Sequence, residues 1–221
     1  MDVTPALILA MWTAGVAGGA AIVSYWSIVG PGYGWLLSGV VVVIAGATAF
    51  SGNLAVAAIA VAAALGAGVL AKRHRLAAAL FGVAAVTQLA VAMNEGGVVQ
   101  AVTGTLLLGA MTSEMLLGHW FLVDPQLPRW ALQRLDLAAG VGLGLDLIVV
   151  AALGAFGGGD VVMIGAMVAL VVMTGLLVAA VWFSLKEPGY SGVMAATGLS
   201  YLGVLTTFGV VVVGRLLLTG L

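Results

Sequence analysis

Two acidic residues, Glu114 and Asp146, lie inside long apolar stretches of the sequence. Glu114 precedes Asp124 by ten residues, which places it roughly 15 Å along a helix at about 1.5 Å per residue. Asp146 follows Asp136 by the same ten residues. Because the hydrocarbon core of a bilayer is about 30 Å thick, we expect both carboxyl groups near its centre. Ionisable groups at that depth typically mark a proton relay, a ligand site or a buried partner.

The same count along the chain predicts further polar side chains at this level: Gln88, Thr174, Ser200 and Tyr201. We therefore predict a buried polar cluster at the bilayer midplane, made of these four residues and the two acids. No Lys or Arg is expected beside it, because Arg215 lies close enough to a helix end to extend its head group to water. Unpaired carboxyl groups there should be at least partly protonated. The cluster has two interpretations, a proton-coupled or ligand-binding pocket, or a hydrogen-bonded contact that fixes helix register.

His119 is the second candidate, near the end of its apolar stretch and close to Trp120, Asp124 and Arg129. We predict that these four residues form an interfacial ligand site. As a haem ligand His119 would need a second axial residue, and the other histidine, His74, lies in a basic loop. As a hydrogen-bond donor it could bind a quinone or a lipid head group. The interpretation we favour is an imidazole bonded to a loop carbonyl or to Asp124.

Composition places these residues in a membrane protein. The 221-residue chain is 63% hydrophobic and 7% charged, against about 25% charged residues in soluble domains. It has no cysteine and two histidines, so Cys-ligated metals and multi-histidine metal cages are excluded, and we expect no metal site. Its 33 glycines favour close helix–helix packing in a bilayer.

Glycine, proline and charged residues divide the chain into eight apolar segments. The sequence therefore predicts an all-α integral membrane protein, residues 1–221 forming a single domain, an eight-helix bundle with short loops. A short amphipathic helix over residues 127–136 is expected to lie on the membrane surface. The predicted membrane helices are 5–26, 33–50, 54–71, 76–93, 98–123, 137–156, 161–185 and 191–218.

Basic residues predict the orientation of these helices. Six of the seven Lys and Arg fall in the loops that follow odd-numbered helices, and the positive-inside rule places such loops in the cytoplasm. Both termini are then outside, in what we expect to be the bacterial cytoplasmic (inner) membrane. The basic run of Lys72, Arg73 and Arg75 is also expected to bind lipid head groups, each residue contributing roughly 1 kcal/mol.

Three functional hypotheses remain open from the sequence. The first is a non-catalytic subunit or scaffold of a larger membrane complex, bound to other membrane subunits or to further copies of itself. The second is a small proton-coupled carrier that uses Glu114 and Asp146. The third is a redox subunit that binds a quinone or haem near His119. Membrane lipids are expected partners in every case, nucleic acid in none, and catalysis is not expected.

Overall fold

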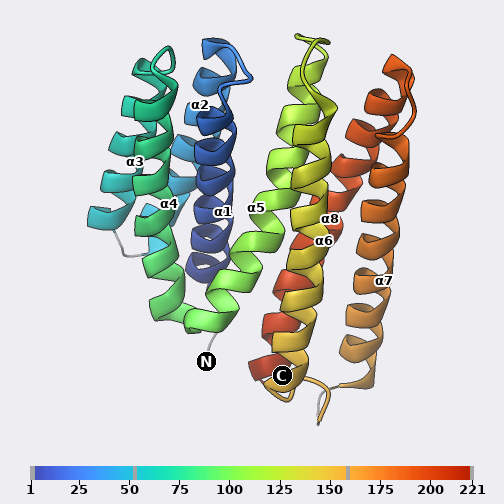
Figure 1. The fold of residues 1–221 in the computed structure, drawn as a ribbon. Helices are drawn as coiled ribbons and strands as arrows, with labels where there is room; N and C mark the ends of the chain where they lie inside the picture. The colour runs from blue at the N-terminus through green and yellow to red at the C-terminus, as the bar shows by residue number, and fades with distance from the viewer. Residues whose placement is uncertain (1–2, 52–53, 158–159, 220–221) are drawn as a thin grey trace. The chain divides into compact units, whose positions relative to one another are not determined.

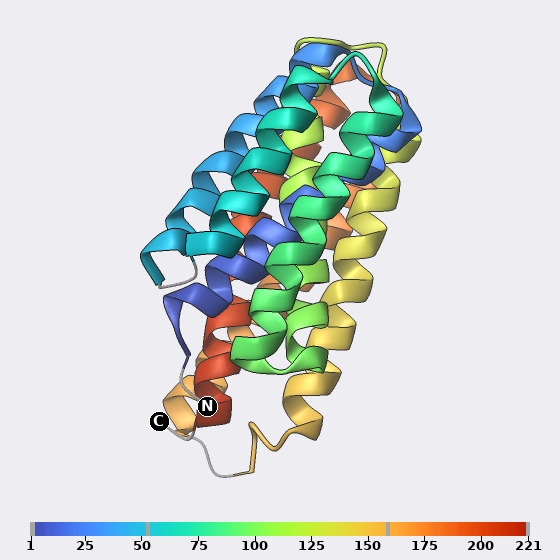
Figure 2. The ribbon, with the colours of Figure 1, turned by 90° about the vertical axis from the view of Figure 1, so that its left-hand side faces the viewer.

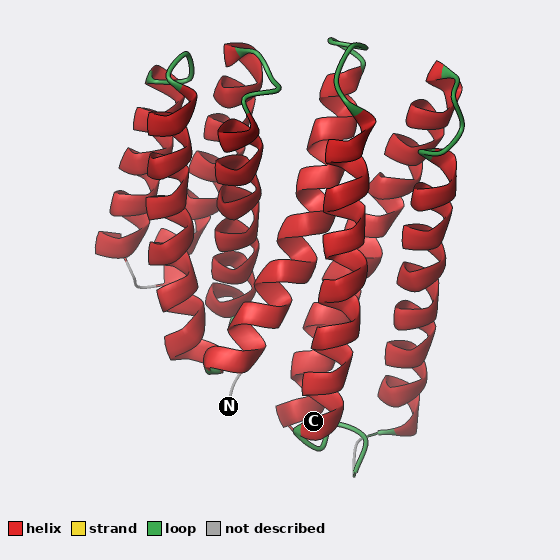
Figure 3. Cartoon of the chain, in the orientation of Figure 1, coloured by secondary structure: helices red, strands yellow, loops and turns green. Residues whose placement is uncertain are grey.

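The computed structural model describes residues 3–51, 54–157 and 160–219 (Figure 1). In these ranges the chain forms eight α-helices, one short 3-10 helix and no strand, as Figure 3 shows. Seven of the α-helices are long and apolar enough to cross a membrane. The all-helical class is thus confirmed, and the seven helices fit an integral membrane protein. The helices are α1 (Pro5–Trp26), α2 (Pro31–Thr48), α3 (Leu54–Val69), α4 (His74–Gly96), α5 (Val98–Phe121), α6 (Arg129–Ala152), α7 (Val161–Ser184) and α8 (Tyr190–Thr219), with the 3-10 helix η1 (Ala49–Ser51) after α2.

Local capping chemistry explains several of these boundaries. Pro5 begins α1, and the Thr4 hydroxyl accepts a hydrogen bond from the backbone N–H of Leu7 at 3.2 Å, as at many helix N-termini. The helix ends where Ser27 adopts a left-handed conformation with φ of 54°. At the start of α7, the Asp160 carboxylate accepts from the N–H of Val162 at 3.0 Å.

Helix α6 differs from the prediction, which separated a surface helix over 127–136 from a membrane helix over 137–156. One continuous helix runs from Arg129 to Ala152 and follows Pro128 directly. Its buried apolar residues repeat every four positions through both predicted parts, so one face stays covered without a break. These residues are Ala131, Leu135, Ala139 and Leu143. Asp136 consequently lies inside the helix, seven residues after its start, and is buried.

The described helices group into two compact units by their contacts. Among the described residues, the N-terminal unit comprises 4–51 and 54–105, and the C-terminal unit comprises 106–157 and 160–219 together with residue 3. In the N-terminal unit α1 packs against α2 and α4, and α3 packs against α2 and α4 (Figure 2). In the C-terminal unit α7 packs against α6 and α8. Each unit therefore has its own helix–helix core.

Candidate functional site

Close contacts at glycines fix the levels of α5, α6 and α8 in the C-terminal unit. A Cβ atom on Gly142 of α6 would lie 2.9 Å from the backbone N and Cα of Leu107 on α5. A Cβ atom on Gly118 of α5 would lie 2.6 Å from Oγ1 of Thr197 on α8. Because α5 is antiparallel to both neighbours, counting from these contacts brings Glu114 of α5 level with residues near 135 on α6 and 201 on α8.

Glu114 and Asp136, which we call the acid pair, are the buried carboxyl groups at this level. They are 0% and 1% exposed, respectively. Counted from the Gly142–Leu107 contact, they lie at about the same level on neighbouring helices. Neither carboxyl oxygen of Glu114, nor Oδ1 of Asp136, has a hydrogen-bond partner among the described residues. The acid pair therefore consists of two buried carboxyl groups, and three of their oxygens have no hydrogen-bond donor among the described residues.

Ser200 of α8 is a buried hydroxyl group close to the level of Glu114, as counted from the Gly118–Thr197 contact. Its own proton is directed elsewhere, since its Oγ donates to the carbonyl oxygen of Ala196 at 2.7 Å. A serine hydroxyl can also accept a hydrogen bond. The Ser200 hydroxyl is thus bonded to its own helix, and its oxygen keeps the capacity to accept a further hydrogen bond.

The structure corrects the predicted surroundings of Asp146. Its two carboxylate oxygens accept hydrogen bonds from the Arg215 guanidinium at 2.5 and 2.6 Å, and both side chains are buried. Arg215 was predicted to extend to water and instead forms an ion pair inside the unit. The reason is packing: Gly214 lies opposite Val150, whose side chain would be 3.3 Å from an added Cβ. Because α6 and α8 run in the same direction, this contact places the Arg215 backbone five residues beyond Asp146, roughly 7.5 Å along the helix. The long arginine side chain reaches back to the carboxylate, since a buried charge needs a partner.

The two acids predicted to meet, Glu114 and Asp146, are therefore at different levels. Glu114 lies beside Asp136, and Asp146 is ten residues further along α6, roughly 15 Å away at about 1.5 Å per residue. The prediction measured the depth of Asp146 from Asp136, which it took to be at the membrane boundary. The continuous α6 helix removes that reference point.

The other predicted members of the polar cluster lie in several places. Thr174 of α7 is buried, and its hydroxyl has no hydrogen-bond partner among the described residues. Tyr201 is 46% exposed, so its predicted burial is wrong. Gln88 belongs to the N-terminal unit, where its amide nitrogen donates to Oγ1 of Thr48 at 3.4 Å. Ser200 is thus the one polar residue of the prediction that the structure places beside Glu114.

His119 pairs with Tyr201, whereas the sequence predicted a loop carbonyl or Asp124 as its partner. Its Nδ1 lies 3.2 Å from the Tyr201 hydroxyl, and the two rings meet edge to face. Asp124 instead accepts a hydrogen bond from the backbone N–H of Gln126 at 3.3 Å. No spacing in the sequence signals this contact, because His119 and Tyr201 are 82 residues apart.

Arg129, also predicted at the interfacial site, binds the turn between α7 and α8. Its guanidinium donates to the backbone carbonyl oxygens of Glu187, Pro188 and Gly189. This fixes the start of α6 to the start of α8. Trp120 is half-buried near the end of α5. His119, Asp124 and Arg129 thus each bond to a different partner.

No protein-family model matches this chain, and no curated protein and no solved structure matches it either. The functional argument therefore depends on the acid pair itself. Among the described residues, no group of three or more His, Asp or Glu side chains could hold a metal ion. The sequence contained a signal for Asp136 that the predicted helix boundary concealed: it shares the buried face of α6 with Leu132, Ala139 and Leu143.

Proposed function

We propose that this protein is a small membrane carrier whose transport cycle includes the binding and release of a proton at Glu114. The observation that supports this most strongly is the burial of both Glu114 carboxyl oxygens without a hydrogen-bond partner among the described residues. A second buried acid, Asp136, lies at about the same level on the neighbouring helix α6. The carrier hypothesis formed from the sequence paired Glu114 with Asp146; here the second acid is Asp136.

A proton is the simplest ligand for this arrangement. An isolated ionised carboxylate in apolar surroundings costs far more free energy than a neutral one unless it is paired. Two adjacent carboxyl groups ionise together only against their mutual repulsion, so they readily share one proton. Interhelical hydrogen bonds in membranes contribute only about 0.6 kcal/mol on average, so the acid pair adds little stability that would justify its cost. A transport role accounts for the burial of two carboxyl groups despite its free-energy cost.

The Asp146–Arg215 ion pair has a separate role in this proposal. Its charges are already balanced and doubly hydrogen-bonded, so it needs no proton. It connects α6 to α8 roughly 15 Å from the acid pair, by the residue count along α6. We assign it to holding these two helices together while the acid pair changes its protonation.

The orientation proposed for the carrier follows the basic residues. The turn between α3 and α4, the start of α6 and the turn after α7 bear most of the Lys and Arg. We propose that they face the cytoplasm of a bacterial cell. The site would then exchange protons across the inner membrane.

Proton movement in liposomes tests the carrier proposal. The full chain is reconstituted with a pH-sensitive dye inside, and a potassium diffusion potential is imposed with valinomycin. The expected result is a proton flux above that of protein-free liposomes, lost in Glu114→Gln and retained in Glu187→Gln. Glu187 is the matched control because it is an exposed acid on the turn after α7.

The competing hypothesis is a non-catalytic subunit of a larger complex. It predicts no flux above protein-free liposomes, together with fixed partner proteins that co-purify with the chain in mild detergent. A flux that Glu114→Gln leaves unchanged would also contradict the proposal, because the proton would then use another route.

A further inference from the structure

An open groove runs between α2 and α3 on the surface of the N-terminal unit. Its volume is about 460 Å³, and its walls are mainly apolar. Trp35 and Val69 are 66% and 83% exposed, respectively, so these two groove residues present large apolar surfaces to the surroundings. The residues that line it are Trp35, Ser38, Leu65, Gly68 and Val69.

Small residues at the base of the groove hold the two helices close together. The Ser38 hydroxyl donates to the carbonyl oxygen of Ala64 across the helix pair at 2.7 Å. A Cβ atom on Gly68 would lie 2.7 Å from the Ser38 oxygen. The base of the groove is therefore filled by this contact, while the larger Trp35 and Leu65 side chains form its edges.

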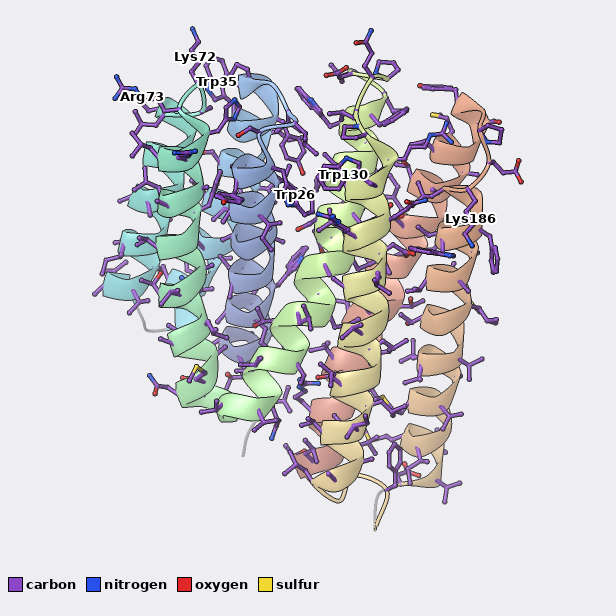
Figure 4. All side chains as sticks on the ribbon, viewed as in Figure 1. Trp26, Trp35, Lys72, Arg73, Trp130 and Lys186 are labelled. Carbon is purple, nitrogen blue, oxygen red and sulfur yellow. The ribbon has the colours of Figure 1, made fainter. Side chains whose placement is uncertain are left out.

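Basic side chains gather just beyond the end of α3 that the groove reaches. Lys72, Arg73 and Arg75 follow Val69 within six residues and are exposed. Among the described residues, Asp146 and Arg215 form the ion pair. Lys72, Arg73 and Arg75 are therefore not paired with a described acid. Figure 4 shows Lys72 and Arg73 at the same end of the unit as Trp35.

Acidic groups are absent from this end of the described N-terminal unit. Residues 4–105 contain one acidic side chain, that of Glu95. It lies at the C-terminal end of α4, away from the basic turn at the start of that helix. Twenty residues separate it from Arg75, which is roughly 30 Å along a helix. Within the N-terminal unit, the exposed charge at this end is therefore positive.

We propose that this groove binds an anionic glycerophospholipid, with an acyl chain between α2 and α3 and the phosphate at Lys72 and Arg73. Apolar walls suit an acyl chain, and tryptophan side chains favour the level of the lipid head groups. Basic residues at the membrane surface attract anionic lipids. The site does not involve Glu114 and is independent of the proposed transport function.

The length of α3 adds an argument for this placement. Its 16 residues span roughly 24 Å, less than the hydrocarbon thickness of about 30 Å. Around an apolar helix shorter than the hydrocarbon core, the bilayer thins and the flanking side chains extend toward the head groups. The basic turn after α3 is thereby brought to the level of the lipid phosphates.

Quenching of Trp35 by brominated lipids tests the proposal in the full chain. The other five tryptophans are replaced by phenylalanine, and the protein is reconstituted in phosphatidylcholine vesicles. Brominated phosphatidylglycerol or brominated phosphatidylcholine with the same acyl chains is then added as the guest lipid. The expected result is preferential quenching by phosphatidylglycerol, because only its head group has a net negative charge.

Two sets of variants, each with its own control, separate the head-group contact from the acyl-chain contact. Lys72→Gln and Arg73→Gln should each lower the preference for phosphatidylglycerol about fivefold, whereas Lys186→Gln in the C-terminal unit should leave it unchanged. Leu65→Phe should fill the groove and weaken quenching by both lipids. Ile59→Phe is its control, because Ile59 is half-exposed on the same helix and does not line the groove.

Three results would overturn the proposal. The first is equal quenching of Trp35 by the two lipids in the parent protein. The second is an unchanged preference after removal of both Lys72 and Arg73 charges. The third is protection of Trp35 from both lipids together with energy transfer between labelled copies, which would show that a second copy of the chain occupies the groove.

Discussion

Two kinds of buried acid occur in the C-terminal unit, and their surroundings differ completely. Asp146 accepts two hydrogen bonds from Arg215, whereas both Glu114 oxygens lack a partner among the described residues. A paired charge depends on its partner, and removing one member leaves the other buried and unbalanced. Replacing an unpaired acid by a neutral side chain of the same shape leaves no unbalanced charge behind, so the loss of stability is smaller.

The first prediction compares these acids by substitution. Asp146→Asn should lower the free energy of unfolding by about 3 kcal/mol, because the Arg215 charge is left buried without its counterion. Glu114→Gln should change it by less than about 1 kcal/mol. The measurement is reversible unfolding in detergent micelles, with Glu187→Gln as the exposed control.

The same measurement has a second arm that isolates the ion pair. Replacing both members, by Asp146→Leu with Arg215→Met, should recover most of the lost stability, since no charge remains buried. Equal losses in Asp146→Asn and Glu114→Gln would contradict the distinction between the two acids.

At the scale of helices, the packing of α5 against α6 sets the level of the acid pair. Gly142 allows the α6 backbone to approach Leu107 closely, and any side chain there would meet the backbone of α5. Gly144, two residues later on the same helix, has no atom within 4 Å of an added Cβ. The two glycines therefore differ in surroundings while sharing one helix.

The second prediction uses this difference. Gly142→Ala should destabilise the protein by about 1–3 kcal/mol, because the new Cβ forces the two helices apart. Gly144→Ala should be neutral or stabilising by up to about 1 kcal/mol, because alanine favours helix more than glycine does. Thermal unfolding in detergent measures both, and a larger loss in Gly144→Ala would contradict the packing described here.

Helices were predictable from the sequence because long apolar runs between glycine, proline and charged residues mark them directly. Helix α1, for example, has the predicted bounds, Pro5–Trp26. The level of one helix against another was not predictable, because it depends on contacts such as Gly142 with Leu107. A single misplaced boundary, at Asp136, therefore moved Asp146 to the wrong level and hid the true neighbour of Glu114.

At the scale of the whole molecule, both units have basic and aromatic side chains at their helix ends. In the N-terminal unit these are Lys72 and Arg73 with Trp35 (Figure 4). In the C-terminal unit Arg134 lies over the Trp130 ring at 4.6 Å, and Lys186 lies over Trp182 at 5.3 Å. Such pairs suit the water–membrane interface, where tryptophan rings and extended cations concentrate.

The third prediction concerns the orientation of these ends. The chain has no cysteine, so single cysteines report one position each. Lys72→Cys and Lys186→Cys should react with a membrane-impermeant maleimide only after cells are opened, and Asn94→Cys should react in intact cells, because basic turns remain in the cytoplasm. The opposite labelling pattern would invert the proposed topology.

The central claim, that Glu114 binds an exchangeable proton, is tested most directly by infrared difference spectroscopy of the reconstituted protein between acidic and alkaline pH. The account predicts a carboxylic acid carbonyl band that changes with pH, disappears in Glu114→Gln and persists in Asp146→Asn. A pH-dependent band that is the same in Glu114→Gln and the parent protein, or the absence of any such band, would contradict it.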